Sequence, residues 1–225
     1  MAICVHHQLY TTSLNLNRDK KRKPPHSIAK PCRTRLFISA AVTNTPSARE
    51  LVQSGVVQAI PAKEANSAMN NEGYVLLDIR PMWEREKAYV TGSLHIPLFV
   101  KDEDNGPITW LKKWVHLGYI GLWTGAKFTT FNLNFLKEVE TSVPDKKTKL
   151  LVACGEGLRS LMAVTRLHKE GYQNIGWLAG GFNRAEDHDF PSIEGVEKLQ
   201  YAAIGGASYY LLQLLVFLQV VGKKS

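Results

Sequence analysis

The sequence predicts an α/β fold, with a mainly parallel sheet flanked by helices and a transmembrane helix near the C-terminal end. Short apolar runs bounded by glycine or proline are typical of buried strands, and amphipathic segments alternate with them in the order strand then helix. A final segment without charge has the length of a membrane span. The 225 residues suffice for one domain with its own core, plus appendages.

Four segments between residues 60 and 100 have the pattern of a helix or a strand. They are, in order, a helix at 62–69 with Pro61 at its first position, a strand at 74–79, a helix and turn at 83–93, and a strand at 94–100. The strand YVLLDI, 74–79, is a continuous apolar run, which is typical of a strand buried on both faces.

The second half of the chain repeats this order. The expected elements are a helix at 132–140 that ends before Pro144, the strand LLVA at 150–153, a helix at 159–170 that Gly171 ends, and the strand NIGWLAGG at 174–181. Strands that alternate with helices in this way indicate parallel pairing.

Residues 101–132 form an insert that begins as a loop and continues as a tryptophan-rich helix. The positions Trp110, Leu111, Trp114, Val115 and Gly118 share one helical face, whereas two lysines, Lys112 and Lys113, lie on another. Three interpretations stay open: the helix packs on the core, which is the commoner outcome, covers a site, or rests on a membrane surface.

Residues 199–221 contain no charged side chain. As one helix they would span roughly 34 Å, which is enough for the hydrocarbon core of a bilayer. The alternative is a helix buried in the protein core. We expect a transmembrane helix, because the charge-free length exceeds that of a typical core helix.

The first 48 residues hold most of the excess positive charge. They carry eight basic side chains and one acidic side chain, Asp19, so the rest of the chain is nearly neutral and a nucleic-acid partner is not expected. A basic leader rich in Ser and Thr is typical of organelle targeting. We expect a chloroplast transit peptide over 1–40, cleaved before Ala41, and a linker at 41–46. The alternatives are a mitochondrial presequence and a basic tail without a routing role.

Cleavage of the leader would remove Cys4 and Cys32 and leave Cys154 as the single cysteine. An internal disulfide is then impossible, and neither cysteine clusters nor histidine spacing indicates a metal site. We therefore expect no metal and no cofactor.

Cys154 follows the predicted strand 150–153 and precedes a helix. Backbone N–H groups at such a helix start are unpaired and favour an anion, including a thiolate or a persulfide. Gly155 and Gly157 let the loop curl, and Arg159 adds positive charge. These features predict a nucleophilic cysteine. The alternative is a buried, inert cysteine.

Four motifs in order resemble the rhodanese-like sulfurtransferases. They are C-x-x-G-x-R-S at 154–160, LLDIRP at 76–81, YVTGSLHIP at 89–97 and GYQNIGWLAGGF at 171–182. The resemblance covers about 47–192 and implies a rhodanese-like domain at 47–195, interrupted by the insert. The whole chain resembles plant chloroplast members of this family with a C-terminal membrane anchor. We expect the thylakoid membrane, with the envelope as the alternative.

The resemblance implies that Cys154 attacks the outer sulfur of a donor such as thiosulfate and becomes a persulfide, which an acceptor then discharges. It assigns binding of the sulfur and its charge to the loop, formed by Gly155, Glu156, Gly157, Leu158, Arg159 and Ser160. Asp78 and Arg80 would brace this loop, although a plain salt bridge is the alternative. With one mature cysteine, the acceptor would be an external thiol such as glutathione or a thioredoxin-type protein.

Two departures from the family pattern bear on activity. Glu156 places a negative charge in the loop, and Ala185 stands where the family has a tryptophan. Phosphatases that share this fold have a C-x5-R loop, one residue longer, so phosphatase chemistry is not favoured. The main alternative function is a membrane-anchored rhodanese module with little or no turnover, used for protein docking or redox sensing.

Overall fold

The computed structural model of the protein describes residues 46–186 and 188–222. The predicted transit peptide, 1–40, lies outside the described residues, as do Cys4 and Cys32 and all of the predicted linker except residue 46.

A five-stranded parallel sheet forms the centre of the described domain, in the order β1-β8-β7-β2-β4. The strands are β1 (Val57–Pro61), β8 (Ile175–Ala179), β7 (Leu150–Ala153), β2 (Val75–Asp78) and β4 (Leu94–His95). The prediction of an α/β fold with a mainly parallel sheet is confirmed. The central strands β7 and β2 have almost continuous apolar sequences because both of their faces are covered.

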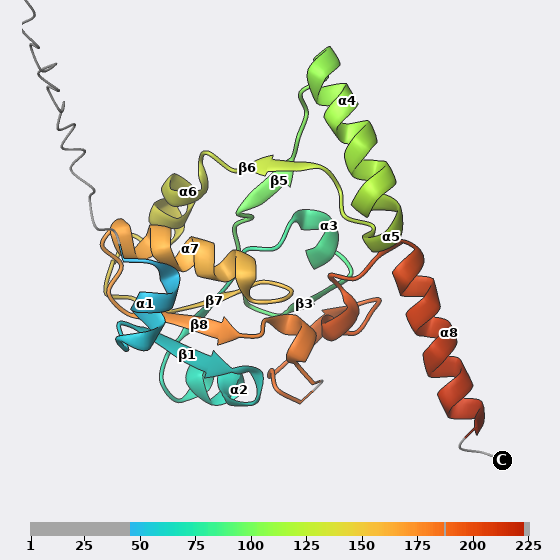
Figure 1. Ribbon diagram of the computed structural model, residues 1–225. Helices are drawn as coiled ribbons and strands as arrows, with labels where there is room; N and C mark the ends of the chain where they lie inside the picture. Colours follow the sequence, from blue (N-terminus) through green and yellow to red (C-terminus); the bar gives the residue numbers. More distant parts are fainter. Residues whose placement is uncertain (1–45, 187, 223–225) are drawn as a thin grey trace, which may run out of the picture. The chain divides into compact units, whose positions relative to one another are not determined.

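Helices cover the two faces of the sheet (Figure 1). One face packs against α1 (Ala48–Gln53), α6 (Phe135–Ser142) and α7 (Leu158–Lys169), and the other packs against α2 (Ala62–Asn70). Alternation along β7 divides its side chains between these layers: Leu150 and Val152 face α7, whereas Leu151 and Ala153 face α2. Cys154 continues on the α7 side.

Two strand features differ from the prediction. Strand β1 was not predicted; it ends at Pro61, where a proline is tolerated because β1 is an edge strand, and Pro61 is also the N-cap of α2, so the helix predicted after it is confirmed. After the short helix α3 (Met82–Arg85), residues Ala88–Val90 form β3, which pairs antiparallel with β9 (Ile193–Gly195). This pairing joins segments about a hundred residues apart, which local sequence patterns do not reveal.

The insert is a two-stranded ribbon that carries a helix (Figure 1). Strands β5 (Phe99–Lys101) and β6 (Thr129–Phe131) pair antiparallel. Between them, α4 (Pro107–His116) continues through a π-helical turn (Leu117–Gly121) into α5 (Leu122–Thr124). No residue of α4 is buried, so this helix does not pack into the core.

The C-terminal segment does not form the continuous helix expected over 199–221. A 3₁₀ turn at Leu199–Tyr201 comes first, and Leu199 and Ala202 are buried in the α2 layer. The helix α8 begins only at Gly206, which has a φ of +62°, and runs to Gly222. Among the described residues, no helix combines the length and apolarity needed to cross a bilayer. The prediction of one long span is therefore wrong, because its first residues belong to the domain core.

Candidate active site

Cys154 lies at the carboxyl end of β7, in the tight loop that leads into α7. The four residues of β7 are all buried, and Cys154 itself is 0% exposed at the residue level. The loop closes at Gly157, whose φ of +91° belongs to the left-handed region that favours glycine. A short buried strand and a glycine turn thus place the sulfur at the N-terminal end of α7.

Hydrogen-bond donors surround the sulfur. The backbone N–H of Gly157 donates to Cys154 Sγ at 3.1 Å, and the N–H of Ser160 donates at 3.3 Å. The thiol donates to Ser160 Oγ at 3.4 Å, and that hydroxyl donates to the carbonyl of Gly157 at 2.8 Å. Donors that converge at a helix N-terminus stabilise negative charge, so this environment suits a thiolate or a persulfide.

A second glycine turn supports the loop from behind. Gly181 has a φ of +66°, and a Cβ at this position would collide with the carbonyl oxygens of Cys154 and Gly155. The backbone N–H of Phe182 donates to the carbonyl of Cys154 at 2.9 Å, and that of Asn183 donates to the carbonyl of Gly155 at 2.8 Å. The double-glycine motif therefore holds the cysteine loop in place, a role that the sequence analysis did not assign to it.

Aromatic side chains pack around the same loop. The indole Nε1 of Trp177 donates to the carbonyl of Gly157 at 2.9 Å. Ala185, at the position of the family's tryptophan, is 2% exposed and lies in the α2 layer. In that layer the rings of Phe182 and Phe190 meet edge to face at 5.7 Å. Packing behind the loop thus includes this phenylalanine pair.

Asp78 and Arg80 form a fully buried ion pair, with Arg80 Nη2 2.7 Å from Asp78 Oδ2. Arg80 also donates to the carbonyl of Ala88 at 2.9 Å. Its guanidinium lies 4.4 Å from the ring centroid of Phe182, whose N–H binds the carbonyl of Cys154. The pair therefore reaches the cysteine loop through Phe182.

Arg159 lies beside the loop, and its charge is already paired. Its Nη1 and Nη2 donate to Glu84 Oε1 and Oε2 at 2.8 and 2.6 Å. Burial alone would lower the pKa of Arg159, but the hydrogen bonds and charge of Glu84, with a further contribution from Cys154, raise it above its usual value. Glu84 comes from α3, and no sequence motif identified it as part of the site.

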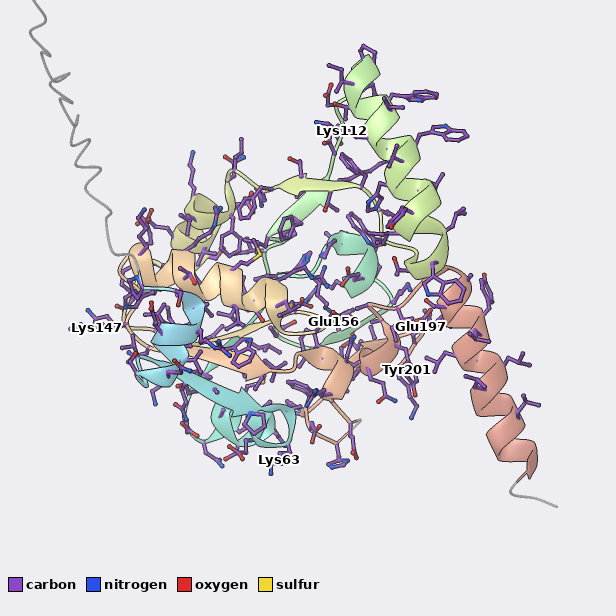
Figure 2. All side chains as sticks on the ribbon, viewed as in Figure 1. Lys63, Lys112, Lys147, Glu156, Glu197 and Tyr201 are labelled. Atoms are coloured by element: carbon purple, nitrogen blue, oxygen red, sulfur yellow. The ribbon has the colours of Figure 1, made fainter. Side chains whose placement is uncertain are left out.

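A pocket of about 760 Å³ opens onto Cys154. Its walls are Pro81, Trp83, Glu84, Lys87, Phe99, 124–127, Thr129, Glu156, Leu158, Arg159, Met162 and 202–206. Glu156 is exposed at this pocket (Figure 2). A Cβ on Gly155 would lie 2.6 Å from Ala203 Cβ, so the segment before α8 closes directly over the loop. The wall residues at 202–206 were not predicted because 199–221 was expected to span a membrane.

The pocket carries little net charge. Arg159 and Glu84 neutralise each other, and Lys87, which donates to the carbonyl of Ile204 at 2.8 Å, lies 4.0 Å from the carboxylate of Glu197. Glu156 opposes the exposed Lys127 among the lining residues. Within residues 46–186 and 188–222, no three His, Cys, Asp or Glu side chains form a group that could hold a metal ion.

Comparison with known proteins places these observations in a family context. Residues 61–188 match the family model described as Rhodanese-like domain. Rhodanese-like domain-containing protein 10 from Arabidopsis thaliana is 62% identical over 184 residues, which cover 82% of this chain and 86% of that protein. The chloroplastic Rhodanese-like domain-containing protein 11 of the same plant is 40% identical over 161 residues, or 72% of this chain and 54% of its own length. Its Thiosulfate sulfurtransferase 18 is 38% identical over 60 residues, covering 27% of this chain and 43% of that protein.

Proposed function

Because the chain belongs to the rhodanese-like domain family, we propose that it is a sulfurtransferase that moves a sulfane sulfur through a persulfide on Cys154. One observation carries the proposal: Cys154 Sγ accepts the N–H groups of Gly157 and Ser160 at the base of a pocket. A free thiol in an apolar core would not have this set of donors. The match to a thiosulfate sulfurtransferase adds support.

The proposed reaction has two steps. The thiolate of Cys154 attacks the outer sulfur of thiosulfate, the bond between the two donor sulfurs breaks, and sulfite leaves with the electron pair. The cysteine then carries one additional sulfur as a persulfide anion. In the second step a thiolate or cyanide attacks that terminal sulfur, forms the new bond to it, and releases the Cys154 thiolate.

The residues of the loop have distinct roles in this proposal. The N–H groups of Gly157 and Ser160 stabilise negative charge on sulfur, and those in the first turn of α7, from Leu158 and Arg159, lack intrahelical acceptors and are available to the terminal sulfur. Gly155 keeps the loop close to the wall at Ala203. Asp78 and Arg80 act as positioning residues through Phe182.

The charge of the pocket bears on the choice of donor. Because Glu84 occupies both terminal nitrogens of Arg159, and because Glu156 lies at the rim, a doubly charged donor gains little attraction. We therefore expect weak binding of thiosulfate and better use of less charged sulfane donors. The acceptor in this proposal is an external thiol, such as glutathione or a thioredoxin-type protein.

The second candidate function is a docking or redox-sensing module with little turnover. The full burial of Cys154 and the pairing of Arg159 favour it, since both limit access and anion binding.

We also propose a chloroplast location, because a 40% identical relative is named chloroplastic and the leader has the composition of a transit peptide. Import into isolated chloroplasts should yield a mature N-terminus that begins AVTNTP, and an intact Met1 would contradict this proposal.

Intact-mass spectrometry after incubation with thiosulfate tests the first step. The full chain should gain one sulfur atom, the gain should map to Cys154, and a thiol should remove it. The Cys154→Ser variant is the control and should gain none. A Cys154 that an alkylating reagent labels but that acquires no sulfur from any sulfane donor would contradict the sulfurtransferase and favour the docking or redox module.

A further inference from the structure

Helix α4 is amphipathic, but it turns its polar face toward the protein and its apolar face outward, the opposite of a helix that packs on a core. Its polar face packs against the rest of the insert: Lys113 donates to the carbonyl of Asp104, and His116 Nε2 lies 3.0 Å from the carbonyl oxygen of Ala126. The His116 ring also packs edge to face on Phe128 at 5.5 Å. The apolar face of α4 therefore points away from its own protein.

Exposed apolar side chains continue along the whole helical run of the insert. Trp110 and Trp114 are 59% and 65% exposed, and their rings lie 6.2 Å apart. The other exposed members are Ile108, Leu111, Val115, Leu117, Tyr119, Ile120, Leu122 and Trp123, each at least 45% exposed. Contiguous apolar patches of this kind mark sites of interaction with a protein or a membrane.

Helix α8 also exposes apolar side chains. Tyr210, Leu211, Leu214, Leu215 and Leu218 are between 47% and 74% exposed. Helices α5 and α8 meet where Gly125, Gly205 and Gly206 are in contact. A Cβ on Gly125 would collide with Gly206, and one on Gly206 would collide with Gly125 and with the carbonyls of Leu122 and Trp123. Figure 1 shows α5 and the start of α8 side by side at this junction.

We propose that the exposed apolar residues of α4, α5 and α8 form one docking surface that inserts into the headgroup region of a lipid bilayer containing anionic lipids. We name this set the α4–α8 surface. These three helices would lie in the interface and would not span the bilayer. Helix α4 has a lysine-bearing polar face and a face rich in Trp and Leu, which is the pattern typical of this binding mode. Helix α8 has no charged side chain and would contribute its exposed tyrosine and leucines. The proposal stands independently of sulfur transfer.

Charge and aromatic content favour lipid as the occupant. Neither α4–α5 nor α8 contains an acidic residue, and the charged side chains within them are Lys112, which is exposed (Figure 2), and Lys113. In the sequence, Lys223 and Lys224 directly follow α8. Lys113 is paired within the insert, where it lies 4.0 Å from Asp102, so Lys112 is the lysine of α4 that is available to lipid. Tryptophan and tyrosine, which the surface holds in quantity, concentrate at the membrane–water interface.

This surface lies next to the pocket that opens onto Cys154. Residues 124–127 and 202–206, which form the junction of the two helices, also line that pocket. Docking would therefore hold the pocket entrance close to the bilayer.

Vesicle flotation of the full chain tests the proposal, with phosphatidylcholine vesicles compared with phosphatidylcholine–phosphatidylglycerol vesicles. The wild type should float with the mixed vesicles, more weakly with phosphatidylcholine alone, and its tryptophan emission should shift to the blue. The variants Trp110→Ser/Trp114→Ser and Leu214→Ser/Leu218→Ser should each weaken partitioning at least about tenfold, because each removes two side chains from the inserted surface.

The control variant is Leu133→Ser, which removes a 93% exposed leucine outside both helices and should float like the wild type. Failure of the wild type to float with mixed vesicles would overturn the proposal. Loss of binding in the α8 variant with full binding in the α4 variant would also overturn it, since the tail alone would then bind. A stable dimer that Trp110→Ser/Trp114→Ser dissociates, without vesicle binding, would assign the surface to a second copy of the chain.

Discussion

The Glu84→Gln variant tests whether pocket charge selects the sulfur donor. Glu84 occupies both terminal nitrogens of Arg159, at 2.8 and 2.6 Å. Glutamine keeps the shape of the side chain and removes its negative charge. Arg159 would then present an unbalanced positive charge beside the loop that binds the donor. We therefore expect a lower KM for the dianion thiosulfate.

Coulomb's law gives the size of this effect. A unit charge and a dianion at roughly 8 Å interact by about 1 kcal/mol in a medium with a dielectric constant of about 80, which corresponds to a KM about fivefold lower. The side chains of Arg159 and Glu84 are 27% and 14% exposed, so the local screening is weaker than in water. About fivefold is therefore a lower bound at low ionic strength, and added salt should reduce the effect.

Initial rates of sulfur transfer from thiosulfate to cyanide, at low and high salt, provide the assay. The matched control is Glu72→Gln, which removes an exposed carboxylate outside the residues that line the pocket and should leave KM unchanged. A KM for Glu84→Gln that is equal to or higher than the wild-type value at low salt would refute the argument that Glu84 cancels the charge of Arg159.

Three further predictions concern stability. In denaturant titrations, Gly181→Ala should destabilise the fold more than Gly171→Ala, and it should also lower kcat. Both glycines have a positive φ, which costs alanine about 1–2 kcal/mol, but of the two only Gly181 lies where a Cβ would meet neighbouring atoms. Asp78→Asn should lower the free energy of unfolding by roughly 3–5 kcal/mol, because it leaves the buried Arg80 uncompensated. The control Glu140→Gln, in an exposed ion pair, should change the free energy of unfolding little. Similar losses in the two variants would contradict the burial argument. Hydroxyl hydrogen bonds from a tyrosine and a threonine hold the pKa of Glu194 below its usual value. Its stabilising contribution is thus complete at neutral pH and is lost as the pH falls through the lowered folded-state pKa; amide exchange in β9 should rise over that range in the wild type and lose this pH dependence in Glu194→Gln.

The central strands could be predicted because their burial is recorded in local sequence. The runs that become β2, β7 and β8 are apolar and end at turn residues, so their type and order follow from composition. The edge strand β1 was not predicted because its last residue, Pro61, is also the N-cap of α2, and local rules recognise only the helix start. The antiparallel ribbon of β3 and β9 depends on partners distant in sequence, which local patterns do not identify.

The candidate site divides in the same way. The cysteine loop could be predicted because its glycines, its arginine and its position before a helix are contiguous in the sequence. The Glu84–Arg159 pair joins residues 75 positions apart, and neither residue type is unusual where it stands. The wall at 202–206 was missed for another reason: an apolar segment reads as one helix until Leu199 and Ala202 are seen to fill the core.

Repeated sulfur transfer from thiosulfate to cyanide by the full chain is the most direct test of the proposal that Cys154 supports sulfurtransferase activity. The account predicts that thiocyanate accumulates beyond one equivalent per protein molecule and that the Cys154→Ser variant forms none above background. An unchanged rate in that variant would contradict the role of Cys154. A wild type that acquires one sulfur and never transfers it would contradict turnover and leave the docking or redox module as the function.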